Sequence, residues 1–460
     1  MVDVIRVQKL NHVNLQLDCD RGVAMELDEA FSFFVPGHQY MPSFKNKMWD
    51  GRIKLFNRNN YQLPVGLYSS LEAFARKHGY EIELIEGPVG YPDEKNDITV
   101  EEIFNFTQKL NYRTKGNKID IRDYQFEAVF KGIRDKRRIL LSPTGSGKSL
   151  IIYTLVRWYL DNFDDKAIIV VPTTSLVEQM FSDFKDYSSE DDSFDVEQEC
   201  HKIFSGREKE NVKQRVIITT WQSIYKLQGK WFDPFGMVIG DECHQFKAKS
   251  LTSIMNKCRN AEYRFGTTGT LDDSEVHELV LTGLFGKVKD VTTTRKLQDE
   301  GTLAKLDIEL LVLKHSEKTR RHFGRQTYQD EIDYIIRHEK RNTFVRKLAL
   351  DQRGNTLVLF QFVKKHGKPL YQDILNHAHE NRKVFFVSGE VETADREAIR
   401  KIVESQNDAI IVASMGVFST GINIRIYIIS YFQVQLNQRS ESYNPSDEVF
   451  VSLIMGKTQN

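Results

Sequence analysis

The sequence predicts an α/β protein with two parallel-sheet domains, the second of them incomplete, preceded by a small α+β domain. From about residue 119, short apolar runs rich in β-branched residues alternate with helical stretches. Runs of this kind suit strands that are buried on both faces of a parallel sheet. They fall into two series along the chain, which indicates two sheets. The expected strands are Ile139–Leu141, Ala167–Val171, Val216–Thr219, Met237–Ile239 and Tyr263–Gly266, then Ile308–Val312, Thr356–Phe360, Lys383–Val387 and Ala409–Ala413.

The first hundred or so residues lack this rhythm and predict the small α+β domain. Alternating polar and apolar residues indicate strands, and Asp50-Gly51 is a strong turn signal. The expected elements are strands at Val2–Val7, Val13–Leu17 and Glu81–Ile85, helices at Asp28–Phe34 and Leu71–His78, and a turn followed by a strand at Trp49–Phe56. We expect domains at residues 1–100, 101–302 and 303–425, followed by an atypical tail at 426–460.

Composition excludes several classes of protein. The 460 residues include 64 basic and 64 acidic ones, so any basic footprint for a nucleic acid must be local. None of the four cysteines forms a CxxC pair, which argues against a zinc ribbon or a disulfide framework. No apolar stretch is long enough for a bilayer and the N-terminus is no signal peptide, so we expect a soluble, cytoplasmic monomer. Ser188–Glu199 is acidic and predicts a solvated loop, whereas Lys318–Asp351 predicts charged helices.

A phosphate site is predicted where the strand Ile139–Leu141 ends. The next residues, Ser142-Pro143-Thr144-Gly145-Ser146-Gly147-Lys148-Ser149, have the form of a P-loop, a Gly-rich turn before a helix. Backbone N–H groups of such a turn and the helix N-terminus attract phosphate, so residues 144–147 would cradle ATP. Lys148 would reach the β- and γ-phosphates and Ser149 would bind Mg²⁺. Ser142 departs from the usual pattern, which has Gly at that position.

A carboxylate for the metal is predicted at the end of a second strand. The apolar run Met237-Val238-Ile239-Gly240 leads into Asp241-Glu242-Cys243-His244. Such a strand delivers its last residue to the carboxyl edge of the sheet, where ligands of α/β proteins bind. Asp241 would orient Mg²⁺, and Glu242 would polarise the attacking water. Lys148, Asp241 and Glu242 are therefore the predicted catalytic residues, and Ser149 and Asp241 the predicted metal ligands.

Asp-Glu-x-His downstream of Gly-Ser-Gly-Lys-Ser resembles the superfamily 2 helicases and translocases, which have two RecA-like domains. Other motifs of that family follow in order over about three hundred residues, which is more specific than any single match. The resemblance implies that Gln125 reads adenine and that Arg122 and Gly421 also contact the nucleotide. It implies that His244 and Thr268-Gly269-Thr270 couple the ATP state to strand contact. The nucleic-acid contacts that it implies are Thr173, Trp221, Gln222, Ser388 and Ser414.

Within this family the chain is similar to phage helicases of recombination and replication forks. Trp49-Asp50-Gly51-Arg52, Trp221-Gln222 and Gly416–Gly421 carry that similarity, which covers residues 1 to about 425. It implies an ATP-driven enzyme that acts on branched or forked DNA or on RNA–DNA hybrids. Unwinding, branch migration, fork regression and strand annealing in recombination, repair and replication would be its reactions.

The segment Phe44–Lys54 of the N-terminal domain interleaves basic and aromatic residues. This suits phosphate contacts combined with base stacking. A core tryptophan beside a solvated turn explains the same residues equally well. The resemblance favours DNA binding, with Lys45, Trp49 and Arg52 as the contacts.

The end of the chain lacks the family's motif Gln-x-x-Gly-Arg-x-x-Arg, whose arginines act as arginine fingers. We read the third base of each codon with the first two bases of the next, from Tyr443 to Val451. That shifted frame permits Gln-Ser-Ile-Gly-Arg-Gly-Leu-Arg, which is the missing motif. Our hypothesis is that residues from about 426 are translated out of frame; a divergent C-terminus or a sequencing error are the alternatives. The second sheet would then lose its last strands, and the apolar run Ile426–Phe432 would partly cover the open edge.

Two other functions fit parts of the pattern. The motor of a restriction-type translocase shares these motifs but needs a nuclease or methylase segment, which the sequence does not show. A non-catalytic nucleic-acid annealing or binding protein would use ATP as a structural ligand, and the missing arginine motif favours it. Phosphate release with and without branched DNA separates these functions.

Overall fold

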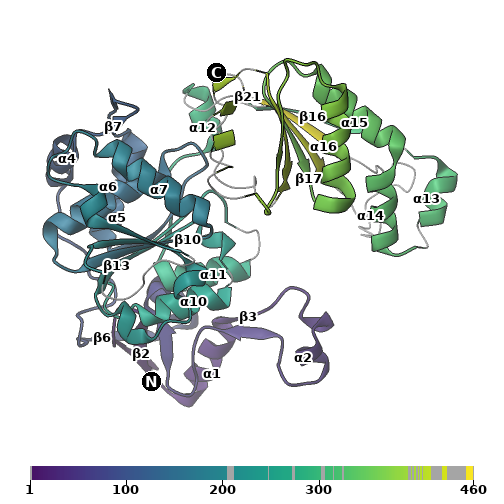
Figure 1. Ribbon diagram of the computed structural model, residues 1–460. Coiled ribbons are helices and arrows are strands. Elements are labelled where there is room, and N and C mark those ends of the chain that lie inside the picture. The colour runs from purple at the N-terminus through teal and green to yellow at the C-terminus, as the bar shows by residue number, and fades with distance from the viewer. Residues whose placement is uncertain are drawn as a thin grey trace. The chain divides into compact units, whose positions relative to one another are not determined.

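The computed structural model describes most of the chain in two compact units, residues 1–297 and 298–460 (Figure 1). The described residues are 3–204, 212–246, 248–271, 275–301, 306–313, 315–323, 326–391, 395, 398–399, 402–403, 405–406, 408–415, 427–432 and 452–458. Both units are built on β-sheets with helices packed against them, so the predicted α/β class is confirmed.

The first unit contains a parallel sheet of seven strands in the order β11-β12-β10-β13-β14-β9-β15. The strands are β9 (Arg137–Leu141), β10 (Lys166–Val171), β11 (Cys200–Ile203), β12 (Val216–Thr220), β13 (Phe235–Asp241), β14 (Tyr263–Thr268) and β15 (Val288–Asp290). The helices along this part are α4 (Val100–Lys109), α5 (Asp123–Asp135), α6 (Lys148–Asn162), α7 (Thr174–Tyr187), α8 (Val196–Glu199), α9 (Trp221–Ile224), α10 (Ala248–Lys257), α11 (Glu275–Phe285) and α12 (Thr294–Asp299).

The five predicted strands of this sheet are its interior strands, and two further strands were missed. All residues of β12, β13 and β14 are buried, which explains their uninterrupted apolar runs. The missed strands, β11 and β15, lie at the two edges, where one side has no neighbour. Edge strands tolerate polar residues such as His201 and Lys202, so the apolar pattern is lost.

The N-terminal module combines a four-stranded sheet, in the order β5-β2-β1-β6, with a separate two-stranded ribbon. Its elements are β1 (Val4–Lys9), β2 (Asn14–Asp18), α1 (Arg21–Ala30), β3 (Ser32–Phe34), α2 (Pro42–Lys45), β4 (Arg52–Lys54), β5 (Gln62–Pro64), α3 (Tyr68–His78) and β6 (Glu81–Ile85). The helix predicted at Asp28–Phe34 is wrong in position. The helix ends at Ala30. Ser32–Phe34 instead forms a strand that pairs with Arg52–Lys54, so its side chains alternate between the two faces of the ribbon. Arg137 Nη2 donates to the His12 carbonyl oxygen at 2.8 Å and ties the module to β9.

The second unit contains a six-stranded sheet in the order β16-β21-β20-β17-β19-β18. Its strands are β16 (Leu306–Val312), β17 (Thr356–Phe360), β18 (Val384–Val387), β19 (Ile410–Ser414), β20 (Tyr427–Phe432) and β21 (Ser452–Thr458), and its helices include α13 (Glu317–Phe323), α14 (Tyr328–Arg337), α15 (Glu339–Asp351) and α16 (Lys368–His377). The predicted helices at Lys318–Asp351 are confirmed. The strand expected within Ile426–Phe432 is present as β20, which pairs in parallel with β17, so that edge of β17 is not open.

The acidic segment after α7 is mostly exposed, as predicted for a solvated loop, but it is anchored at Asp191 and Phe194 and ends in the short helix α8. Asp191 forms an ion pair with Arg157 of α6, and the Arg157 guanidinium lies 4.5 Å from the centre of the Phe194 ring. Arg157 is almost completely buried, as is Phe194. A buried guanidinium needs an anionic partner, and this requirement brings the acidic segment against the helix.

Candidate active site

The P-loop connects β9 to α6 as predicted, and its departure at Ser142 has a structural reason. Ser142 is fully buried, and its Oγ lies 2.5 Å from Ser146 Oγ. The backbone N–H of Ser142 donates to Thr268 O at 2.8 Å. Glycine could not make the hydroxyl contact, which braces the turn from within. Gly145 and Gly147 have φ of +82° and +80°, the left-handed region that a phosphate-binding turn requires.

Gln125 and Tyr124 of α5 support the P-loop from behind. Gln125 Nε2 donates to Ser146 O at 2.8 Å, and the Tyr124 hydroxyl donates to the same oxygen at 3.1 Å. Gln125 Oε1 accepts the backbone N–H of Arg122 at 2.9 Å, and the Gln125 side chain is buried. One amide N–H of Gln125 is left over for the adenine contact predicted from sequence, which stays a prediction. Tyr124, next to the predicted Gln125, was missed.

Replacing Gly147 with alanine should abolish nucleotide binding while the chain still folds. The φ of +80° is strained for any residue with a Cβ, and that Cβ would lie 2.3 Å from Gln125 Nε2. The turn would have to open, at a cost of about 1–3 kcal/mol or more, and would misdirect its N–H groups. Equilibrium binding of a fluorescent ADP analogue measures the loss. Gly229→Ala is the control, because a Cβ there meets nothing within 4 Å; equal binding by both variants would contradict the prediction.

Lys148 and Glu242 form an ion pair at the carboxyl edge of the sheet. Lys148 Nζ lies 2.5 Å from Glu242 Oε1, and both side chains are largely buried. Glu242 Oε2 accepts the backbone N–H of Gly269 at 3.4 Å. Glu242 itself has a φ of +47°, a strained backbone for a residue with a long side chain, and such strain is concentrated at functional sites. The predicted phosphate-binding lysine and the predicted water-activating carboxylate thus lie together.

Asp241 is the last residue of β13, and its carboxylate forms no ion pair with a basic side chain in the described part of the chain, although the charge of Lys148 acts on it. Its Oδ1 accepts two hydrogen bonds, from Thr267 Oγ1 at 2.6 Å and from the backbone N–H of Glu242 at 3.0 Å. Burial, followed by the charge of Glu242, raises the pKa of Asp241. A divalent cation at Oδ2 would offset the burial of the carboxylate and the negative charge of Glu242, so the residue fits a metal ligand.

A phosphate-bound Mg²⁺ needs only one or two protein oxygens, because nucleotide and water supply the others. Ser149 and Asp241 are the protein oxygens predicted for that role.

The predicted coupling residues contact the same edge. Thr268 Oγ1 lies 2.5 Å from His244 Nδ1 and donates to Thr270 O at 2.6 Å. Gly269 supplies the N–H that reaches Glu242. The end of β14 is therefore hydrogen-bonded directly to the Asp-Glu-x-His segment. Thr267, the residue directly before the predicted Thr268-Gly269-Thr270, was missed as a site residue.

Three of the predicted nucleic-acid contacts, Thr173, Trp221 and Gln222, follow the carboxyl ends of the neighbouring strands β10 and β12. Thr173 caps α7, its Oγ1 accepting the backbone N–H of Leu176 at 3.4 Å. Gln222 Nε2 donates to Pro172 O at 3.2 Å. Trp221 is partly buried against the core. Since β10 and β12 pair in parallel up to Val171 and Thr220, these residues are brought together.

In the second unit Ser388 directly follows β18 and Ser414 is the last residue of β19, and these strands pair in parallel up to Val387 and Ala413. The two serines therefore lie side by side, and both are buried. Ser388 Oγ accepts the backbone N–H of Glu390 at 3.3 Å. Gly421, predicted to contact the nucleotide, lies outside the described residues.

Residues 32–54 of the N-terminal module form an extension, here called the arm, which consists of β3, α2 and β4 (Figure 1). The arm's side chains are tied to one another. Trp49 Nε1 donates to Arg52 O at 2.8 Å, and the Arg52 guanidinium lies 4.3 Å from the centre of the Phe34 ring. Lys45 is exposed, as are Tyr40 (74%) and Met48 (76%). Trp49 is only partly buried, so the choice between a core tryptophan and a DNA contact stays a prediction, while Lys45 is available to a ligand.

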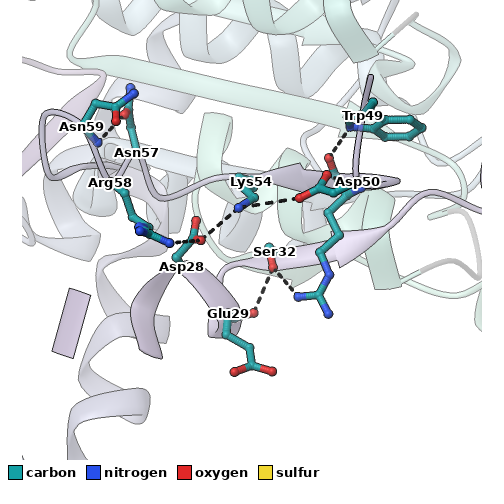
Figure 2. Close-up of polar contacts among 10 residues, drawn as sticks. Asp28, Glu29, Ser32, Trp49, Asp50, Lys54, Asn57, Arg58 and Asn59 are labelled. Carbon is teal, nitrogen blue, oxygen red and sulfur yellow. Dashed lines mark hydrogen bonds and ion pairs between the residues drawn. The ribbon is translucent and has the colours of Figure 1, made fainter. Parts of the chain in front are cut away.

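The base of the arm is fixed to α1 by a buried carboxylate. Figure 2 shows Asp28 between Lys54 of β4 and Arg58 of the following turn, with Oδ2 at 3.0 and 3.4 Å from their nitrogens. Lys54 also reaches Asp50 at 3.7 Å. These ion pairs connect β4 and the turn after it to α1, and so fix the base of the arm to the rest of the module.

The geometry defines a P-loop NTPase of the superfamily 2 helicase class, because a P-loop, an Asp-Glu-x-His strand and a Thr-Gly-Thr strand meet at one sheet edge. A family model for the N-terminal domain of the DNA helicase UvsW matches residues 4–85. A model for the res subunit of type III restriction enzymes matches residues 118–273, which contain the P-loop and the Asp-Glu-x-His segment.

The ATP-dependent DNA helicase uvsW of Enterobacteria phage T4 is 35% identical over 427 residues, which cover 92% of this chain and 82% of that protein. The crystal structure of T4 UvsW has a TM-score of 0.58 and 33% identity, covering 92% of this chain and 82% of that one. The DNA 3'-5' translocase XPB2 of Sulfurisphaera tokodaii is 31% identical over 40% of this chain and 38% of its own length. The chain belongs to the UvsW family of ATP-dependent DNA helicases, and it is an enzyme that uses ATP.

No helix in the described residues is both long and apolar enough to cross a membrane.

Proposed function

We propose that this helicase works on branched or forked DNA and on RNA–DNA hybrids, and that it drives unwinding, branch migration and strand annealing with the energy of ATP. One observation carries the proposal. The residues Lys148, Asp241, Glu242 and Gly269 lie together at the carboxyl edge of the first sheet, next to the predicted strand contacts around Thr173. A nucleotide bound there would lie on the same sheet edge as the nucleic acid. The enzyme would work as a monomer in the host cytoplasm, given the phage origin of its relative.

Within this proposal each residue at the edge has one role. The P-loop N–H groups and Lys148 bind the phosphates, and Glu242 orients and polarises the attacking water. Ser149 and Asp241 hold Mg²⁺, which would neutralise phosphate charge. Thr267, Thr268 and His244 connect these groups to the strand that carries Gly269. Catalysis then comes chiefly from positioning and from charge stabilisation.

We further propose that residues 1–100 bind nucleic acid, that 101–302 and 303–425 are the two motor domains, and that 426–460 is the out-of-frame tail. The N-terminal module would contribute its arm, whose exposed lysine and rim of apolar side chains suit phosphate contact and base stacking. The family model for the N-terminal domain of UvsW matches residues 4–85, and this match supports the assignment of the module to the same helicase.

Strand separation of a forked substrate, beside an unbranched duplex of equal length, tests the substrate class. We expect the chain with its reading frame restored after about residue 426 to process the fork and a four-way junction with ATP and not with a non-hydrolysable analogue. Equal rates on the fork and on the plain duplex would contradict the preference for branches. The second candidate, a non-catalytic annealing protein, predicts annealing of complementary strands without any phosphate release, and the missing arginine motif is what favours it.

The arm gives a separate prediction for DNA binding. Lys45→Ala should lower the slope of log affinity against log salt by about 0.9 for duplex DNA, the value for one lost phosphate contact. Fluorescence anisotropy with a labelled fork at several salt concentrations measures the slope. Lys77→Ala is the matched control, an equally exposed lysine at the end of α3 that lies off the arm. Identical slopes for the two variants would rule out the arm as a DNA contact.

A further inference from the structure

One face of α6 is covered by α7 and by the segment after it (Figure 1). Ser149, Tyr153 and Arg157 are spaced four residues apart and therefore share this face. The Tyr153 ring packs against Phe184 and Tyr187, with ring centres 5.1 and 5.6 Å apart. Above it, Tyr187 Oη lies 2.8 Å from Ser149 Oγ. The hydroxyl predicted to bind the metal is thus already in contact with a phenol from another helix.

The chemistry of a serine ligand gives this contact a function. A neutral hydroxyl binds a cation through an oxygen lone pair, so its own proton must be directed toward some other acceptor. The Tyr187 oxygen is at the right distance to accept that proton. Metal ligands are commonly oriented in this way by a second group behind them.

Tyr187 is held firmly in place at the last residue of α7. The neighbouring Asp186 accepts the backbone N–H of Lys115 at 2.8 Å and the Thr114 hydroxyl at 2.9 Å, which fixes this end of the helix. Its other end is capped by Thr173. A phenol on a helix anchored at both ends can impose one orientation on the Ser149 hydroxyl.

We propose that Tyr187 is a positioning residue that orients the Ser149 hydroxyl, so that an oxygen lone pair of Ser149 is available to the divalent metal of the nucleotide complex. This inference rests on the proposed function, because the metal-binding role of Ser149 belongs to it. Tyr187 lies outside every motif that the sequence suggested. It is the last residue of α7, a helix that begins directly after the predicted nucleic-acid contact Thr173.

Tyr187→Phe tests the proposal, because it removes the hydroxyl and keeps the ring packing. The measurement is the equilibrium affinity for a fluorescent ADP analogue in MgCl₂ and in EDTA. The quantity compared between variants is the affinity in MgCl₂ divided by the affinity in EDTA. We expect the ratio to fall about tenfold in Tyr187→Phe, at the low end of what loss of an outer-shell partner costs. Affinity in EDTA should stay the same, since phosphate contacts are untouched.

Tyr112→Phe is the matched control. Tyr112 is also a buried tyrosine, and its hydroxyl lies 3.0 Å from Oγ1 of Thr154, which belongs to α6 as Ser149 does. It should leave the ratio unchanged. In a Ser149→Ala background, Tyr187→Phe should have no further effect on the ratio. The proposal is overturned if Tyr187→Phe and Tyr112→Phe give the same ratio, or if the effect of Tyr187→Phe persists without the Ser149 hydroxyl. Failure of the unchanged chain to bind nucleotide in either buffer would instead overturn the proposed nucleotide site, and the inference with it.

Discussion

Lys148→Ala and Glu242→Gln should both remove most ATP turnover, yet only the first should remove nucleotide binding. Lys148 is predicted to neutralise phosphate charge in the bound state, and loss of one such group costs about 10²–10³ in rate. Glu242 is predicted to act on water alone, and loss of a general base costs about 10²–10⁴. Phosphate release with forked DNA, measured in the chain with its reading frame restored, and equilibrium binding of a fluorescent ADP analogue separate the two effects.

The ion pair between these side chains sharpens this test. Without nucleotide, Lys148 Nζ contacts Glu242 Oε1, so either substitution leaves one buried charge without its partner. Both variants should therefore melt at lower temperatures in the absence of nucleotide. Nucleotide should restore part of the stability of Glu242→Gln, because phosphate takes the place of the carboxylate beside Lys148, and none of the stability of Lys148→Ala.

Lys202→Ala is the matched control for this pair of variants. Lys202 of β11 forms an ion pair with Glu178 at 2.7 Å in the same unit, away from the P-loop, so its loss removes a comparable contact. We expect its ATP turnover and nucleotide affinity to equal those of the unchanged chain. Nucleotide binding by Lys148→Ala at the original affinity would contradict the role assigned to this lysine.

The parts of the site that could be predicted from sequence are those in which one short segment carries its own geometry. Gly145 and Gly147 signal a turn before a helix, and the apolar run before Asp241 signals a strand that ends at the ligand edge. Parallel sheets bring such strand ends to one edge, so Lys148, Glu242 and Gly269 could be expected near one another. That expectation needs no knowledge of the tertiary structure beyond the fold class.

Contacts between distant segments could not be predicted in this way. The Tyr187 hydroxyl reaches Ser149 across 38 positions of sequence, and Gln125 reaches Ser146 across 21. A tyrosine at the end of an amphipathic helix usually packs in the core, and its pattern gives no sign of a hydrogen-bond partner. The anchored acidic segment was missed for the same reason, since Asp191 is held by Arg157 of another helix.

Restoring the shifted reading frame after about residue 426 should raise DNA-stimulated ATP turnover about 10³–10⁵-fold, the value of an arginine finger. The 460-residue chain should bind nucleotide, because Lys148, Ser149 and the P-loop glycines all lie in the first unit. It should hydrolyse ATP slowly, because the tail contains no Gln-x-x-Gly-Arg-x-x-Arg motif. The strands β20 and β21 pair with β17 and β16, so the present tail contributes strands to the sheet without contributing those arginines.

Three proteins separate this hypothesis from a divergent C-terminus. They are the present chain, the frame-restored chain, and a frame-restored chain in which both arginines of the new motif are changed to alanine. Phosphate release with forked DNA should be fast only in the second, while nucleotide affinity should be alike in all three. Resequencing of the gene gives the independent check. Fast DNA-stimulated turnover by the present chain would refute the hypothesis, because hydrolysis would then proceed without the arginines that the shifted frame encodes.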